Sequence, residues 1–266
     1  MFNLSLYKRE MKISLKLFVI ILSVLAIYII LIIGMYNPDM QKTLGEIVEL
    51  MPELMTAFGM SAYASSLMEF LVSYLYGMLL IVLPLLFCIL RSNALIAKYV
   101  EQGSMVYLVA APVKRRTVAL TQCLVLVSCI TMICVCVSVV QIAAARFYFP
   151  AELDIPGLLE MNTGLMCLLL FCSGFCFLCS CLFSDTRHST AFGAGIPVLM
   201  YLVQMLSNTG GKLEWLRYLT FFTLFNPNGI LQGESAAVAG IIILFTGAVL
   251  LFSAGITVFC YKDLHI

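Results

Sequence analysis

The stretch RSNALIAKYVEQGSMVYLVAAPVKRRTVALTQ, residues 91–122, lies between two long apolar runs. It is the longest polar interruption on the more basic of the two sides that the apolar runs define. Five of the 15 Lys and Arg residues fall in it: Arg91, Lys98, Lys114, Arg115 and Arg116. Cations that flank apolar runs stay at the headgroup level of a membrane. The stretch therefore predicts a surface loop that joins two membrane-spanning helices.

The middle of this loop predicts a short helix. Ser104 is a suitable N-cap, because its hydroxyl can accept a hydrogen bond from a free backbone N–H, and Met105, Leu108 and Val109 follow it. Pro112 ends the helix, since the residue before a proline is pushed out of the α region. A short apolar helix between cations is expected to dock a partner protein; the alternative is a plain interfacial helix with no partner.

The composition is that of an integral membrane protein. Of the 266 residues, 62% are hydrophobic and 11% are charged, and the mean hydropathy is +1.06. Soluble domains contain about 45–50% apolar and about 25% charged residues. With a net charge of +1 and no clustered basic face beyond the loop ends, the chain is not expected to bind nucleic acid. We expect a single all-α transmembrane domain over residues 1–266.

Six apolar runs predict six transmembrane helices in a lipid bilayer. They cover residues 17–36, 70–90, 118–143, 161–183, 190–206 and 237–260. The first run is too long for the apolar region of a cleavable signal peptide, which has about 7–15 residues, so we expect it to be retained.

Three segments outside these runs carry weaker signals. Residues 1–16 interleave basic and apolar side chains and predict an interfacial amphipathic helix, or a basic flank that only sets the orientation. Residues 40–68 have apolar residues at helical spacing with Glu between them, which predicts a helix on the outer surface. Residues 207–236 are aromatic and irregular, and the run 216–225 is too short to cross the bilayer. We expect this last segment to be re-entrant or to lie in the outer interface.

The basic residues are unevenly divided between the two sides that six spans define. The N-terminal segment, the 91–117 loop, the 184–189 turn and the C-terminal tail hold 11 of the 15 Lys and Arg residues. The other side holds the remaining four: Lys42, Arg146, Lys212 and Arg217. The positive-inside rule places both termini and the loop in the cytoplasm.

The spans hold few polar groups that could perform chemistry. No span has a charged residue near its centre, and no His lies within one. Gln141 and Gln204 are polar but do not titrate, so they either hydrogen-bond between helices or line a substrate path. An ion-coupled carrier or an intramembrane enzyme needs titratable or metal-binding groups in the membrane. Both classes are disfavoured, and we expect no catalytic and no metal-binding residues.

The 11 Cys residues lie in or beside the apolar runs, where Cys behaves as a small hydrophobic residue. Cys176 and Cys179 have the CxxC spacing, but no second pair accompanies them. Helix packing is therefore favoured over a metal or redox role for these residues.

The loop resembles the "E-x-G-T … L-L-x-x-P-V-x-R" stretch of ABC (ATP-binding cassette) transporter permeases of the type-2 exporter class. The positions that carry this resemblance are Glu101, Gly103, Ser104, Met105, Leu108, Val109, Pro112 and Arg115. Three further stretches are similar to the bacterial branch of that family: LMPEL with AFGM in 50–60, LRYLT with LFNP in 216–227, and YKD at 261–263. This chain has Ser104 where Thr is usual and Asn226 where Asp is usual.

The resemblance implies a permease subunit of an ATP-driven exporter in a bacterial plasma membrane, which is not an enzyme by itself. Two six-span permeases, as a homodimer or a heterodimer, would enclose the substrate path. Two ATPase subunits beneath them would bind ATP and Mg, so no cofactor is expected on this chain. The 104–110 helix would dock in a cleft of each ATPase. The alternatives are a scaffold or sensor subunit that transports nothing and, with less support, an ion-coupled carrier.

Overall fold

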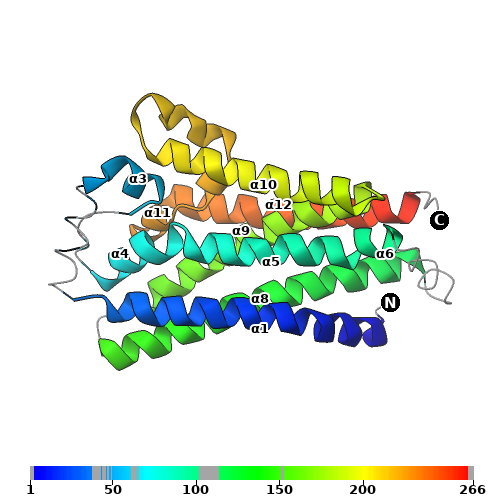
Figure 1. Cartoon of the computed structure of the whole chain (residues 1–266), viewed down its shortest axis with the longest axis horizontal. Coiled ribbons are helices and arrows are strands. Elements are labelled where there is room, and N and C mark those ends of the chain that lie inside the picture. The colour runs from blue at the N-terminus through cyan, green and yellow to red at the C-terminus, as the bar shows by residue number, and fades with distance from the viewer. Residues whose placement is uncertain are drawn as a thin grey trace.

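The helices of the computed structural model follow the apolar runs (Figure 1). The structure describes residues 3–37, 43, 46, 48, 50–60, 64, 66–101, 114–150 and 153–262. Within these residues there is no strand, and six helices are long and apolar enough to cross a membrane. They are α1 (Leu4–Gly34), a composite second helix (Leu67–Glu101), α8 (Arg115–Tyr148), α9 (Ile155–Leu182), α10 (Thr186–Asn208) and α12 (Ser235–Tyr261). The predicted all-α fold with six apolar spans is confirmed.

α1 joins two segments that the sequence separates. Residues 4–16, predicted as an interfacial helix or a basic flank, continue without a break into the first span, because no Gly or Pro interrupts the helix before Gly34. One buried stripe runs along its whole length at intervals of three or four residues: Leu6, Glu10, Ser14, Phe18, Ile21, Leu25, Ile29 and Ile33. This spacing keeps one face of the helix toward its neighbours. The basic half of α1 therefore packs on the bundle through the same face as the apolar half.

α9 lies at the centre of the bundle. In the most apolar 18-residue stretch of α9, 72% of the residues are buried, compared with 22% in the corresponding stretches of α10 and α12. Small residues allow this close packing: a Cβ added at Gly174 would lie 3.3 Å from the Ala248 carbonyl oxygen of α12. The Cys residues of α9 that were expected to pack between helices are buried. Among the described residues no group of three or more His, Cys, Asp or Glu side chains is placed to hold a metal ion.

The second long helix is interrupted. It consists of α4 (Leu67–Leu71), the π-helical turn η1 (Val72–Tyr76), α5 (Leu79–Leu95) and the short α6 (Ala97–Glu101). Pro84 lies inside α5, as the sequence predicts for the second span, but the helix breaks earlier, at Gly77 and Met78. A Cβ at Gly77 would lie 2.1 Å from the Phe58 carbonyl oxygen, so the neighbouring segment fits only against a glycine.

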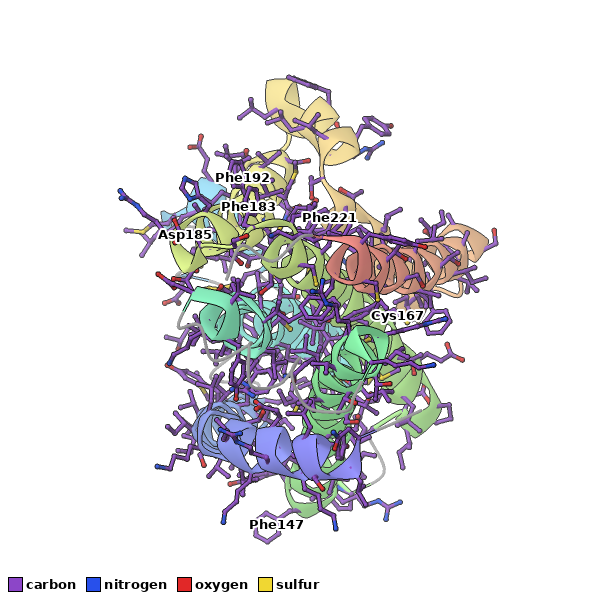
Figure 2. The ribbon with its side chains drawn as sticks, turned by 90° about the vertical axis from the view of Figure 1, so that its right-hand side faces the viewer. Phe147, Cys167, Phe183, Asp185, Phe192 and Phe221 are labelled. Carbon is purple, nitrogen blue, oxygen red and sulfur yellow. The ribbon has the colours of Figure 1, made fainter. Side chains whose placement is uncertain are left out.

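Residues 207–236 fold back on the bundle in two parts. The 3₁₀ helix η2 (Gly211–Leu219) lies against α10, and its Trp215 and Tyr218 are exposed. The following η3 (Phe221–Leu224) and α11 (Pro227–Leu231) pack inward, where Phe222 and Phe225 are buried. Figure 2, which looks along the helices, shows η2 standing outside the bundle while the labelled Phe221 lies on the bundle side of it. The sequence leaves open a re-entrant or an interfacial segment, and the structure has one part outside the bundle and one part within it.

Only part of the predicted surface helix over residues 40–68 lies within the described residues. There, α3 (Pro52–Ala57) is a short helix with Pro52 in its first turn and no buried residue. Asn208 Nδ2, at the end of α10, donates a hydrogen bond to the Ala57 carbonyl oxygen at 3.2 Å. This bond holds α3 beside the end of α10 where η2 begins.

The contact between α12 and η3 gives a first testable prediction. A Cβ added at Gly240 would lie 2.2 Å from the Leu224 carbonyl oxygen, a backbone atom that cannot rotate away. Gly240→Ala is expected to lower the free energy of unfolding by about 1–3 kcal/mol, as overpacking does. Circular dichroism during a titration with denaturing detergent measures the change. Gly195→Ala in α10 is the matched control, since nothing lies within 4 Å of its added Cβ; equal stability of the two variants would contradict the close contact.

Candidate functional site

One end of the bundle, called the basic end below, collects the start of α1, the start of α8, the start of α10 and the end of α12 (Figure 1). Asn3 N, at the start of α1, donates to Thr121 Oγ1 of α8 at 3.3 Å. Arg115 Nη1, at the start of α8, donates to the carbonyl oxygen of Lys262 at 3.1 Å. Lys262 Nζ in turn donates to the Leu182 carbonyl oxygen at the end of α9, at 2.7 Å. Both described ends of the chain therefore lie at the same end of the bundle.

Most of the predicted docking residues fall in a segment outside the described structure, and two of them flank it. Gly103, Ser104, Met105, Leu108, Val109 and Pro112 lie outside the described residues. Glu101 and Arg115 are described, and both lie at the basic end. Glu101 Oε2 accepts a hydrogen bond from Thr186 Oγ1, the first residue of α10. Since Arg115 binds Lys262, the two flanks of the loop are tied to different helices: the first to α10 and the second to the end of α12.

The start of α10 is itself ordered by a charged cap. Asp185 Oδ1 accepts from the backbone N of Arg187 at 2.9 Å, and Asp185 Oδ2 pairs with His188 Nδ1 at 2.9 Å. The backbone bond from Arg187, followed by the side-chain bond from His188, lowers the pKa of the Asp185 carboxyl. An ionised cap stabilises a helix N-terminus, so Thr186 presents its hydroxyl to Glu101 from a defined position.

α6 is the segment that links the loop to the rest of the bundle. Ser180 Oγ of α9 accepts from the backbone N of Ala97 at 3.2 Å and donates to the Ser92 carbonyl oxygen at 2.9 Å. This hydroxyl bridges the break between α5 and α6. Asn93 Nδ2 donates to Thr190 Oγ1 of α10 at 2.5 Å. The end of the second span is thus bonded to both α9 and α10.

A buried ion pair joins the same segment to α1. Arg91 Nη2 lies 3.2 Å from Glu10 Oε2, and the two side chains are 8% and 2% exposed. Tyr99 Oη of α6 donates to the other carboxylate oxygen, Glu10 Oε1, at 2.6 Å. The carboxylate of α1 therefore receives one bond from α5 and one from α6. In a low-dielectric site such charge-assisted bonds are strong, and breaking one leaves a costly unpaired charge.

This ion pair is the main feature of the site that sequence reasoning missed. The sequence assigns Arg91 to the loop and Glu10 to the N-terminal basic segment, whereas both lie inside long helices near the basic end. The expectation that no span has a charge near its centre is unaffected, because the pair lies near the helix ends. One signal was present: Glu10 stands four residues from Leu6 and four from Ser14, in register with the buried stripe.

Gln141, predicted to hydrogen-bond between helices or to line a substrate path, lies in a buried polar cluster that joins three helices. Tyr76 Oη of η1 donates to Asn162 Oδ1 of α9 at 2.7 Å. Asn162 Nδ2 donates to Gln141 Oε1 at 2.8 Å and to Ser138 Oγ at 2.9 Å, both in α8. Gln141 Nε2 completes the ring by donating to Tyr76 Oη at 3.3 Å. In the described structure the Gln141 side chain therefore forms hydrogen bonds to two other helices of the same chain.

Gln204, the other predicted path residue, lies in α10 near the end of the bundle opposite the basic end. Its Oε1 accepts from Thr223 Oγ1 at 2.7 Å, and its Nε2 donates to Asn208 Oδ1 at 3.0 Å. The bond from Thr223 holds the back-folded segment 211–224 against α10, whereas the bond to Asn208 lies within α10 and orients the Gln204 side chain. Gln141 and Gln204 are therefore parts of two different hydrogen-bonded groups.

No protein-family model, no curated protein and no solved structure matches this chain. The described part of the chain is itself that of an apolar membrane protein, with six helices long and apolar enough to cross a bilayer.

Proposed function

We propose that this chain is the transmembrane permease subunit of an ATP-driven exporter, and that it couples to separate ATPase subunits through residues 91–117. Two copies, or this chain and a related one, enclose the substrate path, and ATP and Mg bind to the partner ATPases. The resemblance of residues 101–115 to the loop of ABC permeases motivates this proposal.

The observation that carries it is the bonding of the loop flanks at the basic end. A docking loop transmits force only if its two ends are fixed to the helices that must move. Glu101 is bonded to α10, and Tyr99, two residues earlier, is bonded to α1. Arg115 is bonded to Lys262 at the end of α12. A partner that displaces the loop therefore acts on the first, fifth and sixth spans as well as on the second and third.

The order of the helices in the bundle supports the same assignment. α5 packs against α1 and against α10, so the second span contacts both the first and the fifth. The resemblance to type-2 exporter permeases implies that closure of the two ATPases moves these three spans. Leu86 and Leu90 of α5, together with Leu199 and Leu202 of α10, are exposed and apolar. A second subunit or lipid covers such side chains in a membrane, which is consistent with a path between two copies.

The test is capture of the ATPase. The tagged chain is extracted in mild detergent, and co-purified proteins are identified by mass spectrometry. We expect a soluble protein with a GxxxxGK[ST] phosphate-binding loop. Leu108→Asp is expected to reduce its recovery about tenfold or more, because a carboxylate would replace an apolar contact.

Leu50→Asp is the matched control, since Leu50 is 79% exposed and lies outside the predicted docking loop. It makes the same chemical change without touching the predicted contact, so capture should be unchanged. Equal capture by the Leu108 variant and the wild-type chain would contradict docking through this loop. Absence of any ATPase from a sample in which the chain remains folded would favour a scaffold or sensor subunit.

A further inference from the structure

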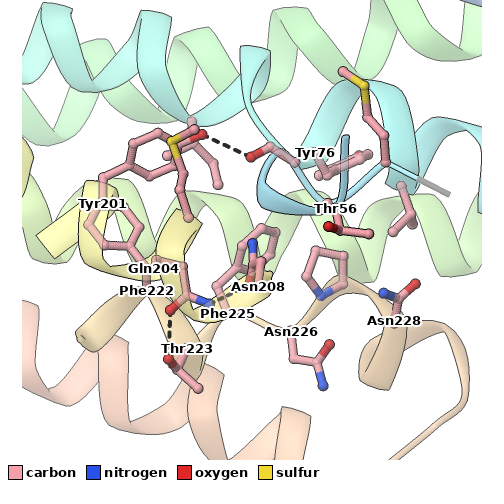
Figure 3. Close-up of a pocket in the computed structure, with 17 residues that line it drawn as sticks. Thr56, Tyr76, Tyr201, Gln204, Asn208, Phe222, Thr223, Phe225, Asn226 and Asn228 are labelled. Carbon is pink, nitrogen blue, oxygen red and sulfur yellow. Dashed lines mark hydrogen bonds between the residues drawn. The ribbon is translucent and has the colours of Figure 1, made fainter. Parts of the chain in front are cut away.

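A cavity of about 410 Å³ opens between α3, η1, α10 and the η3–α11 segment, at the end of the bundle opposite the basic end (Figure 3). Small-molecule sites in proteins have volumes of about 300–1,000 Å³. The cavity lies within one chain, and none of the contacts at the basic end contributes to it. It therefore lies apart from the docking loop, and residues of one chain are enough to line it.

The lining has a specific chemistry. Of the described residues that surround the cavity, none carries a charge. Six have amide or hydroxyl side chains that can both donate and accept hydrogen bonds: Thr56, Gln204, Asn208, Thr223, Asn226 and Asn228. Four more have aromatic rings: Tyr76, Tyr201, Phe222 and Phe225. An ionised ligand would lose its hydration here without gaining a counter-charge. An uncharged ligand with polar groups and an apolar face could form hydrogen bonds with the amide and hydroxyl side chains and pack against the aromatic rings.

The backbone around the cavity supports a built site. Gly77, at the break of the second span, lines the cavity ten residues after Leu67, which is about 15 Å along a helix. Irregular backbone at such depth persists only where protein covers it or where it borders a polar cavity. Tyr201 Oη of α10 donates to the Gly77 carbonyl oxygen at 3.0 Å and so satisfies a group that the break frees. The π-helical turn η1 ends just before Gly77, and π-helical turns occur frequently at functional sites.

The side chains that line the cavity are also held in place from behind. Tyr76 forms part of its wall, and its hydroxyl is fixed by Asn162 and Gln141 in the buried polar cluster. Gln204 is fixed by Thr223 and Asn208, as the dashed lines in Figure 3 show for the side chains drawn. Polar groups whose orientation is already set lose little entropy when a ligand binds. Of the two glutamines singled out from the sequence, Gln204 lines the cavity, and Gln141 does not line it but fixes Tyr76, which does.

We propose that this cavity binds an uncharged molecule that combines hydroxyl or amide groups with an apolar face, of which an alkyl glycoside is the simplest example. The proposal goes beyond the exporter function and does not depend on it, because the site lies in one chain and requires no ATPase. The same chemistry is available from the headgroup of a neutral membrane glycolipid and from a soluble glycoside.

The test uses three photoactivatable probes with the same octyl tail and a diazirine in that tail. Their headgroups are glucose, trimethylammonium and sulfate. The purified full chain is reconstituted in nanodiscs of neutral phospholipid, labelled by light and analysed by mass spectrometry. We expect saturable labelling by the glucoside of the peptides that contain Tyr201 or Phe225, about tenfold above that by either charged probe.

A charge variant separates recognition from simple partition into the membrane. Gln204→Glu keeps the shape of the side chain but places a carboxylate in the cavity. It is expected to weaken labelling by the glucoside about tenfold and to make trimethylammonium the preferred headgroup. Gln232→Glu is the matched control, since Gln232 is exposed in the same region but does not line the cavity. A merely structural role for Gln204 would not reverse the headgroup preference.

Competition identifies the source of the ligand. Displacement by methyl glucoside supports a soluble ligand, and displacement by octyl glucoside alone supports a membrane lipid. Equal labelling of the cavity peptides by all three probes would overturn the proposal. Labelling that excess unlabelled octyl glucoside does not displace would also overturn it. Neither result would bear on the ATPase capture, so failure of this site leaves the proposed exporter function open to its own test.

Discussion

Replacement of Arg91 by Met is expected to lower the free energy of unfolding by about 3–5 kcal/mol. The guanidinium of Arg91 lies 3.2 Å from the Glu10 carboxylate, and both side chains are almost completely buried. Removal of the cation leaves that carboxylate bonded to the Tyr99 hydroxyl but without the counter-charge of Arg91. A buried charge without a counter-charge is far more costly than a buried pair. Circular dichroism during a denaturing-detergent titration measures the loss.

Two further variants assign this loss to the pair. In the double variant Glu10→Gln, Arg91→Met the buried charge is absent, and the Gln oxygen can still accept from Tyr99. We expect it to recover most of the stability lost by Arg91→Met. Arg116→Met, an exposed arginine at the start of α8, is the matched control and should change the free energy of unfolding by no more than about 0.5 kcal/mol. A similar small effect for Arg91→Met would show that the pair does not hold α1 to α5.

The positions of the six spans are predictable because lipid imposes a strong constraint: each crossing needs about 20 apolar residues. The helices nevertheless extend further than the apolar runs. α1 begins at Leu4 and α8 continues to Tyr148, because polar and basic side chains at the headgroup level do not interrupt backbone hydrogen bonding. Only a glycine, a proline or a change of packing ends a helix there, and apolar composition reports none of these.

The break in the second span illustrates what composition cannot predict. Pro84 is the visible helix breaker, yet it is accommodated inside α5. The helix breaks at Gly77, where the Phe58 carbonyl oxygen comes too close for any Cβ and Tyr201 supplies a hydrogen bond. Phe58 follows the separate helix α3, and Tyr201 is 124 residues away from Gly77 in the sequence. The π-helical turn therefore depends on tertiary contacts, which hydrophobic periodicity does not describe.

The two polar clusters differ in how far the sequence identifies them. Gln141 stands out as a polar residue in an apolar run, and interhelical bonding is one of the two roles predicted for it. Its partners Asn162 and Tyr76 were not identified, since Asn162 lies near the start of its span and Tyr76 resembles many other aromatic residues of the chain. Glu10 and Arg91 are 81 residues apart, and Glu10 stands beside Lys8 and Arg9, which remain exposed. The docking residues 103–112 lie outside the described residues, so their role remains a prediction.

Asn162→Leu is the second substitution with a large expected effect. The Asn162 side chain makes three hydrogen bonds, to Tyr76, Gln141 and Ser138, and it is 4% exposed. Leucine has a similar volume but can make none of them. The Tyr76 hydroxyl would lose the acceptor of its hydrogen bond and the Gln141 oxygen would lose its donor, both in the interior of the bundle. We expect a loss of about 2–4 kcal/mol in the free energy of unfolding, because each buried polar group without a partner costs about 1–3 kcal/mol.

The control is the next residue, Thr163→Val, which removes only a local bond to the Leu159 carbonyl on an exposed face of the same helix. It should leave the stability within about 0.5 kcal/mol of the wild-type value. Tyr76→Phe removes one hydroxyl and keeps the ring, so it is expected to cost less than Asn162→Leu while retaining the aromatic wall of the cavity. If Asn162→Leu proved as stable as Thr163→Val, the cluster would not stabilise the bundle. Interhelical bonds in membranes are often worth only about 0.6 kcal/mol, because the unfolded chain finds other partners there. A cost well above that value would therefore show that Asn162, held between η1 and α8, stabilises the fold through the connected cluster as a whole.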